Sequence, residues 1–139
     1  MMVSLVQENC GACRADAPRV TEEEMAELLP QLPHWQVVDR EGIPQLERTF
    51  PFKDFASALE FTLRVGGVAE AEGHHPLLMV DTLCATDPPP PAWGKCTVVW
   101  WTRKIRGLHR NDFIMAAKTD RLYEEAGAQA ARGIRWGMR

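Results

Sequence analysis

Apolar residues recur at helical spacing in three segments of the chain. In residues 20–32, Met25, Leu28 and Leu29 form one apolar stripe. The strongest pattern covers residues 52–73, where the recurring positions are Phe52, Phe55, Ala56, Leu59 and Leu63. The third segment covers residues 111–126. The sequence therefore predicts three helices.

Capping residues stand where these helices would begin and end. Thr21 and Glu24 have the spacing of a capping box, in which each side chain bonds to the backbone of the other residue. Gly73 follows the second segment and is suited to a helix C-terminus. Asn111 or Asp112 is available as the cap of the third helix.

Four segments have the composition of strands: residues 34–40, 44–50, 77–85 and 95–104. Residues 41–44 link the first two as a hairpin, whereas Pro88–Pro91 must lie outside the sheet because proline has no N–H to donate to a ladder. We expect an α+β fold of order α-β-β-α-β-β-α. Its four-stranded antiparallel sheet would carry the three helices on one face.

The composition is that of a folded globular domain. The chain has 139 residues, of which 45% are hydrophobic and 25% charged. We expect an N-terminal arm at 1–20, one domain at 21–126 with a proline-rich insertion at about 82–92, and a flexible basic tail at 127–139. A net charge of -3 argues against nucleic acid and acidic membranes as partners. Neither a signal peptide nor a membrane-spanning run is recognisable, so we expect a cytoplasmic protein.

The four cysteines give only a weak zinc signal. Cys10 and Cys13 have the spacing of a metal knuckle, but Cys84 and Cys96 do not supply a second close pair. The alternative is a pair of thiols in a loose N-terminal arm. We expect no metal site.

Two adjacent histidines are the chain's clearest candidates for chemistry. His74 and His75 follow the predicted second helix and precede Pro76, a turn from which both imidazoles could reach one pocket. Imidazole can both give and take a proton near neutral pH. Glu70 lies one helical turn earlier and could orient one of the rings. The alternative is two solvated loop histidines.

The motif around these histidines resembles that of the pterin-4a-carbinolamine dehydratase family. That motif has an acid, three residues, two histidines and a proline, then an aromatic, nine residues, a third histidine, eight residues and an aspartate. The matching positions here are Glu70, His74, His75, Pro76, Trp93, Arg103 and Asp112. Trp93 matches only if the proline-rich segment is an insertion, and Arg103 stands in place of the third histidine. The resemblance runs from about residue 12 to residue 123.

The resemblance implies a dehydratase acting on 4a-hydroxytetrahydropterin without a cofactor. It makes His74 an acid/base, His75 a residue that holds the pterin, and Glu70 a supporting carboxylate. Trp93 and Asp112 would also belong to the substrate site. The third histidine of the family would be the second acid/base, and that position is Arg103.

Arginine is a poor substitute for an acid/base. Its guanidinium stays protonated at neutral pH, so it neither accepts nor readily gives a proton. Loss of one general acid/base typically costs about 10²–10⁴ in rate. We therefore expect an inherited site with weak or absent activity.

A basic run surrounds this arginine and suggests a second role. Arg103, Lys104, Arg106 and Arg110 lie close together and could contact an acidic partner, or could be ordinary surface charges. One branch of the family resembles a RuBisCO assembly factor of carboxysomes with an altered site. The favoured hypothesis is therefore a degenerate dehydratase that assists RuBisCO assembly, with carboxysome association. The alternative is an active dehydratase in pterin recycling. Either would be a homodimer or higher oligomer.

Overall fold

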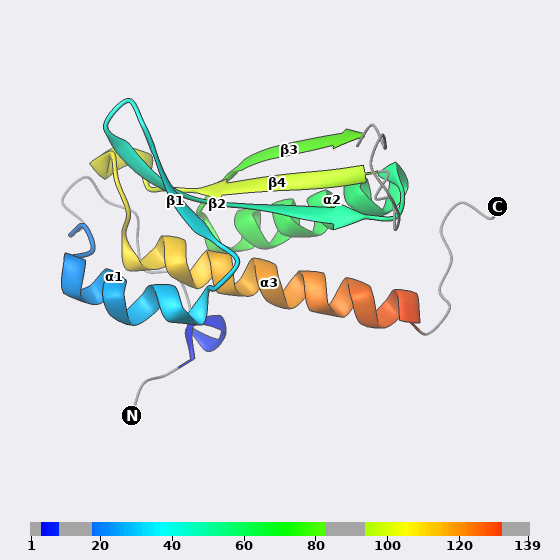
Figure 1. Ribbon diagram of the computed structural model, residues 1–139, viewed down its shortest axis with the longest axis horizontal. Helices are drawn as coiled ribbons and strands as arrows, with labels where there is room; N and C mark the ends of the chain where they lie inside the picture. Colours follow the sequence, from blue (N-terminus) through cyan, green and yellow to red (C-terminus); the bar gives the residue numbers. More distant parts are fainter. Residues whose placement is uncertain (1–3, 9–17, 83–93, 132–139) are drawn as a thin grey trace.

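The computed structural model describes residues 4–8, 18–82 and 94–131 (Figure 1). Its helices are α1 (Glu22–Leu28), α2 (Phe55–Glu72) and α3 (Arg110–Ala131), and its strands are β1 (Gln36–Arg40), β2 (Ile43–Phe52), β3 (Leu77–Thr82) and β4 (Gly94–Trp100). Three short 3₁₀ turns are η1 (Leu5–Gln7), η2 (Leu29–Gln31) and η3 (Arg103–Ile105). The predicted order of helices and strands is confirmed.

The four strands form one antiparallel sheet in the order β1-β2-β4-β3. Figure 1 shows α2 and α3 lying along one face of this sheet, with α1 beside the first half of α3. Alternate residues of β4, namely Cys96, Val98 and Trp100, are fully buried against the helices. The predicted fold, a four-stranded sheet with its helices on one side, is confirmed. Pairing of two copies, for which the edge strands β1 and β3 are candidates, stays a prediction.

The predicted capping box opens α1. The Thr21 hydroxyl accepts from the Glu24 backbone N–H at 3.1 Å, and the Glu24 carboxylate accepts from the Thr21 N–H at 2.9 Å.

Among the described helices, none combines the length and the apolar character that a membrane span requires.

Helix α2 buries a different face from the one its most prominent apolar stripe suggests. Phe55, Leu59 and Leu63 are 43%, 41% and 66% exposed. The buried positions are Ala58, Phe61, Val65 and Ala69. The smaller residues of this second row let the helix approach the sheet closely, and Phe61 contributes to an aromatic cluster with Phe50, Phe52 and Tyr123.

Several boundaries differ from the sequence expectations. The last strand ends at Trp100, before Arg103, which lies in η3 instead. Helix α3 continues to Ala131, beyond the expected start of the tail at residue 127. The described piece of the N-terminal arm docks on the domain, because Leu5 is 1% exposed and the Lys118 ammonium donates to the Val6 carbonyl.

Three of the four cysteines lie outside the described residues, namely Cys10, Cys13 and Cys84. Most of the proline-rich insertion lies outside them as well. Cys96 is buried in the core, and this burial raises the pKa of its thiol. A buried, protonated thiol is a poor nucleophile and a poor metal ligand.

His109 caps the start of α3. Its Nδ1 accepts a hydrogen bond from the Asn111 backbone N–H at 3.0 Å, so this nitrogen carries no proton. The backbone N–H of His109 donates to the Asp112 carboxylate at 2.9 Å. Burial lowers the pKa of His109; the nearby His74 acts in the same direction, whereas Asp112 and Glu24 oppose it. The folded state therefore favours the neutral imidazole that the cap requires.

This cap should make stability depend on pH. The folded pKa of His109 is depressed below its unfolded value of about 6.5, so its contribution is full above that pH and falls as the pH drops through the folded pKa. Asparagine caps helices well and does not titrate. His109→Asn should therefore lose less stability than the wild type between about pH 7 and pH 5, measured by urea unfolding. Parallel losses in the two proteins would contradict this role.

Candidate functional site

The chain turns sharply where α2 ends, and this turn places both histidines. Gly73 adopts the left-handed conformation, with φ of 68°, and its N–H bonds to the carbonyls of Ala69 and Glu70. The His74 N–H also bonds to the Ala69 carbonyl, at 3.1 Å. Residues with a side chain rarely adopt such a φ, so glycine is favoured here. The predicted helix end at Gly73 is confirmed.

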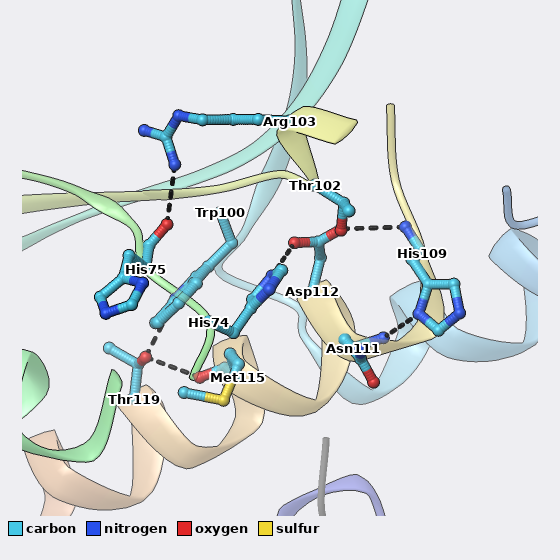
Figure 2. A network of polar contacts seen from close by, with 10 residues as sticks. All are labelled: His74, His75, Trp100, Thr102, Arg103, His109, Asn111, Asp112, Met115 and Thr119. Carbon is cyan, nitrogen blue, oxygen red and sulfur yellow. Dashed lines mark hydrogen bonds and ion pairs between the residues drawn. The ribbon is translucent and has the colours of Figure 1, made fainter. Parts of the chain in front are cut away.

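His74 is buried and bound to a buried carboxylate. Its Nε2 lies 2.6 Å from Oδ1 of Asp112, and the two side chains are 4% and 0% exposed. The other carboxylate oxygen, Oδ2, accepts from the Thr102 hydroxyl at 2.8 Å and from the His109 N–H at 2.9 Å. Figure 2 shows Asp112 between His74 and His109, with Thr102 beside it.

These bonds define which nitrogen of His74 carries a proton. An ionised carboxylate only accepts hydrogen bonds, and the Asp112 carboxylate already accepts two at Oδ2. Nε2 of His74 is therefore the donor in its bond to Oδ1. The carboxylate thereby fixes the tautomer of the ring.

A tryptophan fixes the plane of the same ring. The rings of His74 and Trp100 are parallel within 7°, with centroids 5.7 Å apart (Figure 2). The Trp100 indole N–H donates to the Thr119 hydroxyl at 3.1 Å, and that hydroxyl donates to the Met115 carbonyl at 2.7 Å. A chain of contacts from α3 through β4 thus restrains His74.

His75 points the other way and meets solvent. Its Nε2 lies 2.8 Å from Oε1 of Glu70, and the two side chains are 60% and 81% exposed. An exposed pair of this kind adds little stability. It leaves an imidazole at the surface, oriented by a carboxylate and open to exchange protons with a ligand or with water.

Arg103 lies next to His75 but in a fixed orientation. Its Nη1 donates to the His75 backbone carbonyl at 2.9 Å (Figure 2), and its guanidinium carbon lies 4.2 Å from the ring centroid of Trp101. The turn η3 is thereby joined to the start of β3. The family motif has its third histidine at position 103. In the structure, the residue at position 103 lies beside the histidine pair.

The other predicted site residues differ in placement. Asp112 is completely buried, so its carboxylate has no surface with which to contact a ligand directly. Trp93 lies outside the described residues. Within the described ranges, no group of three or more His, Cys, Asp or Glu side chains is arranged to hold a metal ion.

The basic run is also divided. Arg103, Lys104 and Arg106 are exposed. Arg110 instead forms a two-point ion pair with Glu8, at 2.9 and 2.7 Å, and this pairing lowers the pKa of the Glu8 carboxyl. Arg110 therefore holds the N-terminal arm against α3.

Sequence reasoning missed four residues that support the site. Thr102, Trp100, Thr119 and His109 bind or pack against the His74–Asp112 pair, or against each other. The sequence contained a signal for one of them, His109. It precedes Asp112 by three residues, which is the spacing between a helix N-cap and the side chain that accepts from the backbone N–H of that cap. The contacts of the others are made across the fold and leave no local pattern.

The chain is similar to known proteins over most of its length. Residues 18–122 match the family model described as pterin 4 alpha carbinolamine dehydratase. A Gloeobacter violaceus protein named "Putative pterin-4-alpha-carbinolamine dehydratase 1" is 52% identical over 126 residues, which cover 91% of this chain and 99% of that protein. A Saccharophagus degradans protein named "Putative pterin-4-alpha-carbinolamine dehydratase" is 50% identical, covering 88% of this chain and 99% of its own.

A solved structure agrees in fold. The Brucella melitensis protein described as a transcriptional coactivator/pterin dehydratase is 30% identical, with a TM-score of 0.60, and the match covers 76% of this chain and 99% of that one. The match extends over nearly the whole length of each of these three proteins. The chain belongs to the pterin-4a-carbinolamine dehydratase family.

Proposed function

We propose that this chain dehydrates 4a-hydroxytetrahydropterins, at a rate limited by Arg103. The observation that carries the proposal is the presence of two neighbouring imidazole–carboxylate pairs, His74 with Asp112 and His75 with Glu70. Dehydration requires one proton to reach the departing hydroxyl and one to leave a ring nitrogen. Imidazoles held by carboxylates are suited to both transfers.

The two histidines would divide the work by their exposure. His74 is 4% exposed and its ring is held by Asp112 and Trp100, so we assign proton transfer to this fixed imidazole. His75 is 60% exposed and is assigned to hold the pterin, with Glu70 orienting its ring. Asp112 is a positioning residue, because it contacts His74 and is itself buried.

Arg103 would slow the reaction rather than abolish it. Its guanidinium contacts the His75 carbonyl and Trp101, and a guanidinium neither accepts nor readily releases a proton at neutral pH. One of the two proton transfers must then go through water or through the remaining histidines.

An imidazole at position 103 should restore the faster route. Arg103→His is expected to raise kcat for a 4a-hydroxytetrahydropterin by about 10²-fold or more, the effect typical of one general acid/base. Spectrophotometric detection of the dihydropterin product measures it. His34→Asn is the control, because His34 is exposed and lies outside the site. Wild-type turnover that Arg103→His leaves unchanged would contradict the proposed limit, and no dehydration by either protein would contradict the proposed function.

The second candidate function is assistance of RuBisCO assembly, with a degenerate site and carboxysome association. One observation favours it: Arg103, Lys104 and Arg106 are exposed within a single short turn, where an acidic protein surface could contact them. Arg110 supports it less than expected, since its charge is paired with Glu8.

Co-expression with RuBisCO tests this candidate. If the chain assists assembly, the yield of assembled, active RuBisCO should rise in its presence, and Lys104→Glu with Arg106→Glu should remove the increase by reversing the charge of the turn. Arg121→Glu is the matched control, an exposed α3 arginine away from that turn. Equal RuBisCO yield with and without the chain would reject the assembly role and leave the dehydratase proposal standing.

A further inference from the structure

The Arg103 side chain is held in place although it is exposed. Two contacts fix it: the stacking of its guanidinium on Trp101 at 4.2 Å and the bond from Nη1 to the His75 carbonyl at 2.9 Å. A solvated arginine ordinarily samples many rotamers, and ordering it costs about 2 kcal/mol of side-chain entropy. Here much of that cost is met within the fold, before any ligand arrives.

The fixed guanidinium keeps hydrogen-bond donors for a ligand. Within the described residues, it donates from Nη1 alone, which leaves the N–H groups of Nε and Nη2 without a protein acceptor. Guanidinium groups bind phosphate through two parallel N–H donors, and such charge-assisted bonds are about twice as strong as neutral ones. An ordered arginine with unused donors is therefore suited to an oxyanion.

The surrounding charge favours an anion as well. Lys104 and Arg106 are exposed on the same turn as Arg103, in a chain whose net charge is -3. Glu70, the exposed acid of the site, is hydrogen-bonded to His75. Three exposed cations suit a phosphate ester, which carries about -1.5 to -2 charges at neutral pH.

We propose that Arg103 binds an anionic group on the substrate, so that the site prefers a reduced pterin whose side chain carries a phosphate. This inference rests on the proposed function and names its substrate class. The guanidinium donates to the backbone carbonyl of His75, the residue assigned to hold the pterin, and is thus placed next to that residue. A pterin with a neutral side chain gains nothing from this charge.

Calorimetric binding of two stable pterins tests the preference without requiring catalysis. 7,8-Dihydroneopterin and its side-chain monophosphate share one reduced ring and differ in the anionic group. The wild type should bind the monophosphate about tenfold more tightly, equivalent to about 1.4 kcal/mol. Arg103→Gln should abolish this ratio, and Arg103→Lys should keep only part of it, because lysine retains the charge but not the planar donors.

Arg121→Gln is the matched control, since it removes one exposed positive charge elsewhere and should keep the tenfold ratio. Unfolding curves of each variant verify that it is folded. Equal affinity of the wild type for the two pterins, or a ratio that survives Arg103→Gln, overturns the inference while the proposed function stands. Binding of neither pterin overturns both.

Inorganic phosphate alone separates a pterin site from a general anion site. Inorganic phosphate should bind at least tenfold more weakly than the monophosphate, because it lacks the ring that His75 is assigned to hold. Equal affinity for inorganic phosphate would overturn the assignment to a phosphorylated pterin.

Discussion

The buried carboxylate of Asp112 is the interaction on which both the site and the local fold depend. It joins the entry to β3 through His74, the segment after β4 through Thr102, and the start of α3 through the His109 N–H. A charge without solvent contact is tolerated only when it is fully hydrogen-bonded, and here both oxygens are bound. Removal of the His74 ring would leave Oδ1 unsatisfied, which typically costs about 1–3 kcal/mol, whereas Oδ2 would keep one bond if the Thr102 hydroxyl were lost. The position of the His74 ring is therefore fixed by the same contacts that hold together the entry to β3, the segment after β4 and the start of α3.

The same arrangement gives two adjacent histidines opposite roles. His74 turns inward, where Asp112 sets its tautomer and Trp100 sets its plane. His75 turns outward, where Glu70 and water surround it. Both histidines lie in the short segment between the turn at Gly73 and the start of β3 at Leu77, and their rings bond to different carboxylates. One residue is held rigidly for proton transfer, and its neighbour remains accessible to a ligand.

Local patterns in the sequence were sufficient to predict the elements but not their burial. The capping box at Thr21, the helix end at Gly73 and the four strands follow from short-range rules and are confirmed. The buried face of α2 did not follow, because that helix has two apolar rows and the larger side chains, such as Leu63, face outward. The choice between the rows depends on how closely the helix must approach the sheet, which no local pattern specifies.

For the candidate site, the sequence predicted which residues take part but not how each of them is buried or placed. The motif identified Glu70, His74, His75, Arg103 and Asp112, and the fold brings them into two neighbouring groups. It did not indicate that Asp112 is fully buried behind His74, nor that Arg103 lies in the turn η3 rather than on a strand. These placements depend on Trp100, Thr102 and Thr119, which act across the fold and carry no chemical signature of their own.

Asp112 holds the proton of His74 on Nε2, and the ¹⁵N chemical shifts of the His74 ring report directly on which nitrogen carries that proton. In the wild type, Nε2 should remain protonated throughout the pH range in which the chain is folded. In Asp112→Asn, the amide oxygen should stay with the His109 N–H and its NH₂ should face His74, which forces the ring proton to Nδ1. A wild-type ring whose Nε2 is unprotonated, or a spectrum that Asp112→Asn leaves unchanged, would contradict the account.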